Sequence, residues 1–170
     1  IRAVLERLPT RVEREPVLRR GQGGDDTTAI DQAAEDAAVE RLGALNEDFV
    51  LVSEELGTRT FGAGGPVHVI VDPIDGSVNA KRGIPYFSFS LAVAAGGTMA
   101  DVELAYVYDF GSGEEWTAER GSGARLDGEP LRTPPPKDTL EILSFEGTTT
   151  EAIAERLRVV LRRRLHAAAG

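Results

Sequence analysis

Cysteine is absent from this chain of 170 residues. Disulfides, thiolate metal sites and cysteine nucleophiles are therefore excluded. Histidine occurs only at His68 and His166, which are far apart in the sequence, so zinc chemistry is not expected. No apolar stretch reaches the roughly 18 residues that a membrane helix needs, and residues 1–15 are too charged for a signal peptide. We therefore expect a cytoplasmic protein with no membrane partner.

Basic residues are scarce, and lysine is the scarcest of them. The net charge is −9, from 28 acids against 19 bases, and only Lys81 and Lys137 are lysines. This balance argues against non-specific binding of nucleic acid, which needs a basic surface. A composition rich in acids and poor in lysine suits a salt-rich cytoplasm, or it reflects a GC-rich genome that favours arginine codons.

The order of the predicted elements indicates an α+β fold. Hydrophobic residues make up 41% and charged residues 28% of the chain, an ordinary globular balance. We predict a helix in 2–20 that breaks near Pro9, followed by a glycine-rich loop at 19–26. A second helix begins with Thr28 as its N-cap and runs to about Leu45, which lies on its apolar face. Loops are predicted at 57–66 and 133–138, a final helix at 149–165, and strands at 49–53, 67–71, 87–95, 101–110, near Trp116 and at 141–146. Helices followed by a mostly antiparallel sheet are typical of the α+β class.

Two of the predicted strands end in carboxylates. Glu54 and Glu55 follow strand 49–53, and Asp72 and Asp75 follow strand 67–71. If the two strands are neighbours, Glu54 and both aspartates converge at one edge of the sheet, where like charges repel unless a cation lies among them. Carboxylate oxygens favour Mg²⁺ first, then Mn²⁺ or Ca²⁺. The carbonyl of Ile74, between the aspartates, is a further candidate ligand.

The residues that follow the aspartates suit a phosphate group. Gly76 allows the backbone to approach a ligand closely. If a helix starts at about Ser77, its free N–H groups form an anion site. Carboxylates that hold Mg²⁺ beside a helix start have the layout of metal-assisted hydrolysis of phosphate esters.

Each of these motifs also has a purely structural interpretation. The Glu-Glu pair alone fits a solvated turn, Asp72 to Gly76 alone fits a type I turn, and Asp31 alone fits an acid at a helix start. The spacing of the acids excludes one class of phosphatase and one calcium-binding motif. Phosphatases with an aspartyl nucleophile need aspartates two apart, whereas these are three apart, and the EF-hand pattern also fails here.

Four segments together resemble a known family. They are "DDTTAIDQAAE", "VSEELG", "VDPIDGSVNAKRGIPYFSFSLAVA" and "GSGEEWTAERGSGARLDGEPL". Their order and spacing, over about residues 25–132, resemble the inositol monophosphatase superfamily of Mg²⁺-dependent, lithium-sensitive sugar phosphatases, whose central signature is D-P-[IL]-D-G-[ST]. "GIPYFSFS" and "ELAYVYD" look most like the archaeal-type branch, which acts on fructose 1,6-bisphosphate and inositol phosphates. The resemblance implies a layered α+β fold with helices packed on a mostly antiparallel sheet.

The resemblance also implies metal ligands. Glu54, Asp72 and the Ile74 carbonyl would bind a first Mg²⁺, Asp72 and Asp75 a second, and Glu54 would lean toward a third, weakly bound ion. Mn²⁺ is an acceptable substitute. Asp25 or Asp26, in the glycine-rich loop, would touch the third ion, and Glu55 would support the ligands from behind.

The remaining implied roles concern the substrate and the attacking water. Asp75 and the backbone N–H groups of Gly76 and Ser77 would contact the phosphate. The Ser77 hydroxyl and Asp31 would orient and deprotonate the water. The substrate would be inositol monophosphate or fructose 1,6-bisphosphate. Alternatives are a 3′-phosphoadenosine phosphate or NAD(P) phosphatase, or a non-catalytic member that serves as a binding module.

The chain departs from the family pattern in two respects. Ser77 stands where threonine is commoner, and no later W-D-x-A-[AG] segment supplies the family's further aspartate ligand. We therefore expect an N-terminal portion of a phosphatase, inactive by itself and homodimeric when full length. Residues 1–132 would form an N-terminal α+β metal-binding domain, and residues 133–170 a linker and the start of a truncated C-terminal part.

Overall fold

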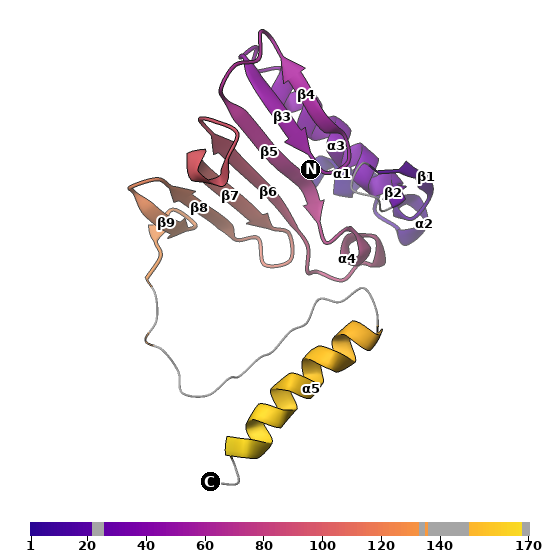
Figure 1. Ribbon diagram of the computed structural model, residues 1–170. Helices are drawn as coiled ribbons and strands as arrows, with labels where there is room; N and C mark the ends of the chain where they lie inside the picture. The colour runs from indigo at the N-terminus through magenta and orange to yellow at the C-terminus, as the bar shows by residue number, and fades with distance from the viewer. Residues whose placement is uncertain (22–25, 133–134, 136–149, 168–170) are drawn as a thin grey trace. The chain divides into compact units, whose positions relative to one another are not determined.

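An eight-stranded sheet forms the centre of residues 1–132 (Figure 1). Its strand order is β10-β9-β8-β7-β6-β5-β3-β4, and every neighbouring pair is antiparallel except β3 and β5, which are parallel. The predicted α+β class is confirmed. The strands are β3 (Phe49–Ser53), β4 (Gly57–Phe61), β5 (His68–Asp75), β6 (Ser88–Ala94), β7 (Val102–Asp109), β8 (Glu115–Glu119), β9 (Gly123–Leu126) and β10 (Glu129–Pro130).

Alternation along the central strands builds the core. In β3, Phe49, Leu51 and Ser53 are buried while the residues between them are partly exposed, as expected for a strand with one covered face. Leu51 pairs with Val69 of β5, and Ser53 pairs with Val71. Phe49, Leu51, Val69 and Val71 form one apolar cluster, which side chains of a long helix cover.

Three helices, α1 (Arg2–Arg7), α2 (Arg11–Arg14) and α3 (Ala29–Gly43), come early in the chain, and α4 (Ser77–Arg82) follows the end of β5 (Figure 1). The 3-10 turn η1 (Met99–Asp101) lies between β6 and β7, and α5 (Thr150–Ala167) comes after the sheet in the sequence. The predicted break near Pro9 and the predicted final helix are confirmed. Thr28 caps α3 as predicted, in a reciprocal pair of hydrogen bonds with Asp31. Ile30 and Ala34 of α3 pack with Ile74 and Ala80 in a second apolar cluster.

Three local predictions were wrong. Residues 57–61, expected in a loop, form the edge strand β4, because Thr58 and Thr60 extend the backbone and pair with β3 despite their exposure. The predicted loop 19–26 begins and ends in β1 (Val17–Arg20) and β2 (Asp26–Thr28), which form a two-stranded sheet. Leu45 is 58% exposed, because α3 ends before it, at Gly43.

The structure, a computed structural model, describes residues 1–21, 26–132, 135 and 150–167. The predicted strand 141–146 lies outside these residues. The chain divides into two compact units, Ile1–Arg132 and Thr133–Gly170, and the first holds all the candidate site residues.

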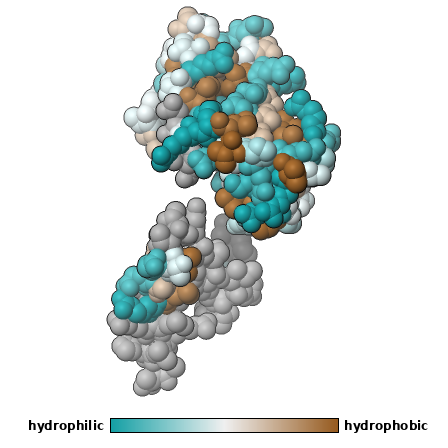
Figure 2. Space-filling model, turned by 90° about the vertical axis from the view of Figure 1, so that its right-hand side faces the viewer, coloured by the Kyte–Doolittle hydropathy of each residue, from teal (hydrophilic) through white to brown (hydrophobic). Residues whose placement is uncertain are grey.

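None of the described helices is long and apolar enough to cross a membrane. On the face of this first unit seen in Figure 2, hydrophobic residues form separate patches between hydrophilic ones.

Candidate active site

The parallel pairing of β3 and β5 brings two acidic strand ends to the same edge of the sheet. Ser53 pairs with Val71 in the last matched position of the two strands, and Glu54 and Asp72 follow directly. The two strands lie side by side and run in the same direction (Figure 1). The condition that the sequence left open, that these strands are neighbours, is therefore met.

Asp72 is the electrostatic centre of this edge. The pKa of its carboxyl is raised from an ordinary 3.8 to about 7, first by burial and then by the charges of Glu54 and Asp75 and a hydrogen bond with the Glu54 carboxyl. The Ile74 N–H, which donates to Asp72 Oδ1 at 3.1 Å, acts in the opposite direction and lowers the pKa. Near neutral pH this edge therefore favours any positive charge, whether a proton or a metal cation.

A β-bulge between the two aspartates shapes the end of β5. Asp72 pairs with Ser90 of β6 and Asp75 with Ser88, so Pro73 and Ile74 together lie opposite a single β6 residue. Such a bulge interrupts the ladder and redirects the chain. Ile74 is turned into the core. Its backbone lies at the interruption, between the two aspartates, where its carbonyl remains the predicted ligand.

Gly76 makes the sharp change from β5 to α4. Its φ of 86° lies in the left-handed region, which other residues rarely adopt. A Cβ atom added at this position would lie 3.2 Å from the Tyr86 carbonyl oxygen and 3.3 Å from the Phe87 Cβ. Glycine is thus required at position 76 both by conformation and by space, whereas its predicted close approach to a ligand stays a prediction.

Gly76→Ala is expected to destabilise the fold by about 1–3 kcal/mol, the usual range for a strained backbone residue with added crowding. Gly83→Ala is the matched control. Gly83 also has a positive φ, of 73°, but an added Cβ there meets nothing within 4 Å. Urea denaturation of both variants separates strain from crowding. Equal losses of unfolding free energy in the two variants would contradict the steric role of Gly76.

Asp31 joins the site from α3. Its Oδ2 atom accepts hydrogen bonds from the Thr28 N–H at 2.8 Å and the Thr28 hydroxyl at 2.6 Å. The structural interpretation of Asp31 as an acid at a helix start is therefore correct. Asp31 nevertheless also lines a small recess at the acidic edge of the sheet, so the capping role does not remove it from the candidate site.

This acidic recess has a volume of about 50 Å³ and collects residues from separate elements. Its lining consists of Asp26, Asp31, Glu54, Glu55, Asp72, Pro73, Ile74 and Ser77. Asp75 and Gly76 lie next to it in the chain but do not line it, and Asp75 is exposed. Within the described ranges, no three Asp, Glu or His side chains are yet gathered closely enough to hold a metal ion. Mutual repulsion of the carboxylates opposes a closer approach.

The donors of the acidic recess fit a hard divalent cation. They are carboxylate and carbonyl oxygens without sulfur or imidazole, the set that Mg²⁺ and Mn²⁺ prefer. Burial next to other acids raises the pKa of Asp72, which means that its negative charge is unfavourable without a positive partner. A bound divalent cation would supply that positive charge.

The sequence did not reveal the polar residues that support the recess from behind. Glu35 and Ser53 are buried at 1% and 5% exposure, and the Ser53 hydroxyl donates to Glu35 Oε2 at 2.5 Å. The hydroxyl of buried Thr27 donates to Glu55 Oε2. One signal was present, since Glu35 lies on α3 beside the core residue Ala34 and one turn after Asp31.

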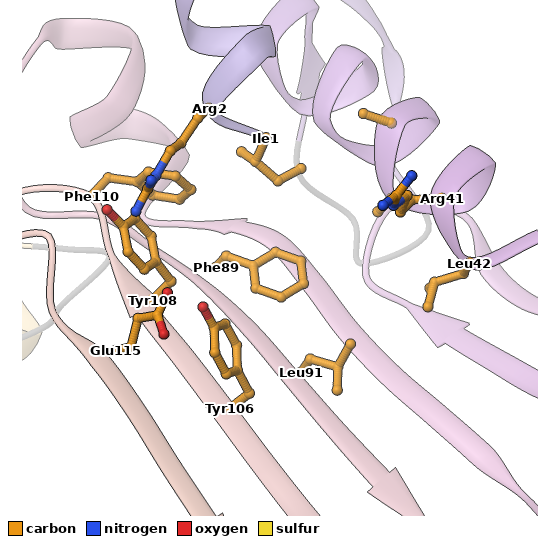
Figure 3. A pocket seen from close by; sticks show the side chains of 12 residues that line it. Ile1, Arg2, Arg41, Leu42, Phe89, Leu91, Tyr106, Tyr108, Phe110 and Glu115 are labelled. Atoms are coloured by element: carbon orange, nitrogen blue, oxygen red, sulfur yellow. The ribbon is translucent and has the colours of Figure 1, made fainter. Parts of the chain in front are cut away.

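A second, larger hollow of about 410 Å³ lies between α3 and the sheet (Figure 3). Phe89, Leu91 and Tyr106 line its floor, and the Arg2 guanidinium lies 4.4 Å from the centre of the Tyr108 ring. Burial, and then the charge of Glu115, raise the pKa of the Tyr106 phenol. Glu115 is its single carboxylate, so chemistry that needs several acids belongs to the smaller acidic recess.

Comparison with known proteins shows which family this chain resembles. The family model described as "Inositol monophosphatase family" matches residues 2–167. The fructose-1,6-bisphosphatase/inositol-1-monophosphatase of Archaeoglobus fulgidus is 39% identical over 129 residues, which cover 76% of this chain and 48% of the relative. The Nus factor SuhB of Escherichia coli is 35% identical over 108 residues, which cover 64% of this chain and 39% of the relative.

Solved structures show the same fold. An inositol monophosphatase of Thermotoga maritima aligns with a TM-score of 0.60 and 32% identity, over 79% of this chain and 51% of the other. The chain thus spans about half the length of the curated relatives that it matches.

Proposed function

Because this chain belongs to the inositol monophosphatase family, we propose that its full-length gene product is a Mg²⁺-dependent phosphomonoester hydrolase. The proposed substrates are inositol monophosphate and fructose 1,6-bisphosphate, because the name of the Archaeoglobus fulgidus relative includes both activities. The acidic recess is the observation that carries this proposal, because it gathers carboxylates from the turn after β3, from β5 and from α3.

The ligands that we propose for the cations are Glu54, Asp72, Asp75 and the Ile74 carbonyl. Two of the carboxylates already touch, since Glu54 and Asp72 share a hydrogen bond. A bound divalent cation would supply a more acidic water and would neutralise charge on the phosphate. Asp75 would have to turn inward to join, which its exposed position permits.

The water-activating and phosphate-binding roles fall to residues around the ligands. Ser77 and Asp31 both line the acidic recess, so their side chains can act on one water molecule. The first N–H groups of α4 have no partner within the helix, and those of Gly76 and Ser77 are the proposed phosphate donors. Asp31 would accept the proton from the water while its capping bond to Thr28 fixes its rotamer.

Removal of divalent cations is expected to abolish hydrolysis. Full-length protein treated with EDTA should release no phosphate above background from either substrate, because the carboxylates alone repel the substrate's phosphate. Excess Mg²⁺ should restore the rate, and Mn²⁺ should substitute. A colorimetric phosphate assay over a panel of phosphate esters, which includes 3′-phosphoadenosine phosphate and NADP, measures both the metal requirement and the substrate preference. Turnover that persists in EDTA would contradict the proposal.

A second candidate is a binding role without turnover. It is favoured by the similarity to a protein named for another activity, the Nus factor SuhB of Escherichia coli. The two candidates differ in one measurement, since a binding module should bind Mn²⁺ in the acidic recess yet hydrolyse no ester of the panel at millimolar Mg²⁺. Phosphate release that depends on Asp72 would exclude the purely binding role.

A further inference from the structure

All the buried polar residues of the first unit's described part belong to one layer. Thr27, Thr28, Asp31, Glu35 and Ser53 are each at most 5% exposed. Thr28 bonds Asp31, Ser53 bonds Glu35, and Thr27 bonds Glu55. This hydroxyl–carboxylate layer joins β2 and α3 to the end of β3, and two of its carboxylates, Asp31 and Glu55, also line the acidic recess.

Among the residues of this layer, Glu35 is the one whose burial costs the fold the most free energy. Its side chain is 1% exposed, and its Oε1 atom is buried with no hydrogen-bond partner in the described structure. Burial, opposed by the Ser53 hydrogen bond and reinforced by the charge of Glu55, raises the pKa of the Glu35 carboxyl. An apolar residue would fill this place between Ala34 and Ala38 at a lower cost. A partly unsatisfied buried carboxyl at such a place calls for a functional explanation.

The bond between Glu35 and Ser53 fixes the point where Glu54 leaves the sheet. Ser53 is the last residue of β3 that is paired with β5, and Glu54 follows in a turn. Backbone pairing with β5 no longer restrains Glu54, so the backbone at Glu54 depends on contacts of the residues on either side of it. The Ser53 hydroxyl bond to Glu35 holds the strand side, and the Thr27 bond to Glu55 holds the other side.

The same bond connects Glu54 with Asp31. Asp31 and Glu35 are four residues apart on α3 and therefore lie on one face of the helix. Glu35 tethers that face to Ser53, and Asp31 reaches the acidic recess one turn earlier. The Glu35–Ser53 contact is thus a polar link between the helix that carries Asp31 and the strand end that carries Glu54, beside the apolar packing of α3 on the sheet.

We propose that Glu35 is a positioning residue which, through the Ser53 hydroxyl, holds Glu54 at the separation that cation binding requires. This inference rests on the proposed function. Glu35 itself touches neither the cation nor the substrate. Errors of about 1 Å in a supporting contact are enough to weaken such sites strongly, and loss of an outer contact usually lowers metal affinity about 10–100-fold.

The test uses full-length protein with Glu35→Ala, Glu35→Gln and Ser53→Ala. Glu35→Ala and Ser53→Ala should each raise the calorimetric Kd for Mn²⁺ and the half-saturating Mg²⁺ concentration at least about tenfold. The double variant should be little worse than either single one, because the pair acts as one unit. Glu35→Gln keeps an oxygen that accepts from Ser53 and should remain within about threefold of the wild type. Glu40→Ala, an exposed glutamate on the same helix, is the matched control and should bind Mn²⁺ normally.

Two outcomes would overturn the proposal. The first is a Ser53→Ala protein that melts at a lower temperature but binds Mn²⁺ normally, since Glu35 and Ser53 would then be ordinary core residues. Because Ser53→Ala removes only a hydroxyl, this variant decides even if Glu35→Ala does not fold. The second is a wild-type protein that binds no Mn²⁺ at millimolar concentration. That result overturns the proposed function together with this inference, whereas normal wild-type binding beside a normal Ser53→Ala affinity overturns only the inference.

Discussion

Asp72→Asn is expected to abolish hydrolysis in the full-length protein and, in the absence of divalent cations, to make it more stable. Turnover should fall at least about 10³-fold, because the substitution removes the central charge of the acidic recess and with it the stabilisation of the transition state. Stability should rise, because the same charge is buried beside Glu54 and Asp75 and is costly without a cation. Opposite signs for activity and stability are the mark of a functional residue held at a structural cost.

The gain in stability should depend on pH in a defined window. The folded pKa of Asp72 is about 7, above the ordinary 3.8 expected for the unfolded chain, so the folded state binds the extra proton between these values. Wild-type stability therefore falls as pH rises through this window. The advantage of Asp72→Asn should be absent below about pH 4 and complete above about pH 7.

Solvent screening limits the size of this gain, because Asp72 is only partly buried. We expect about 1 kcal/mol at pH 8 in EDTA, a rise of a few degrees in melting temperature. Asp36→Asn, which changes an exposed aspartate of α3, is the control and should alter neither property. A melting temperature that collapses in Asp72→Asn would identify Asp72 as a structural residue instead.

Those parts of the fold with a strong local signal could be predicted from the sequence. Strand 49–53 was predicted with the bounds that the structure gives it, because its residues form one short apolar run. The Thr28 cap of α3 was also predicted from a local signal, because an acid, Asp31, follows Thr28 at the capping-box spacing of three residues. Strand β4 was missed, because its burial is low throughout and its conformation depends on pairing with β3. Such pairing is a long-range property that local propensity does not contain.

The candidate site was predictable to a similar degree. Its acids stood out because they follow apolar strands, but their convergence required β3 and β5 to be neighbours, which no local pattern decides. Glu35 was missed because glutamate is rarely buried, and its neighbours Ala34 and Ala38 indicated only an apolar helix face. The structure now places Asp31, Glu54, Asp72, Ile74 and Ser77 around one recess, while their catalytic roles stay predictions.

Ser77→Ala in the full-length protein should lower kcat about 10²-fold or more with little change in KM. The substitution removes the hydroxyl that would orient the attacking water and keeps the backbone N–H that would contact the phosphate, so it separates the two roles of Ser77. Ser77→Thr retains a hydroxyl and should keep most of the activity. Steady-state kinetics at saturating Mg²⁺ measures each variant.

Asp31→Asn should reduce kcat by a similar factor, and the double variant with Ser77→Ala should be little worse than either single one, because the pair would act as one unit on one water. Asp31 also caps α3 through Thr28, so the variant should lose about 1 kcal/mol of stability as well. Asp101→Asn provides the matched control. Asp101 accepts the equivalent hydrogen bonds from Thr98, at 2.9 and 2.7 Å, at a surface position outside the acidic recess. If Asp31→Asn slows turnover no more than Asp101→Asn does, Asp31 is only a cap. Independent, multiplying losses in the double variant would show that Asp31 and Ser77 do not share a proton path.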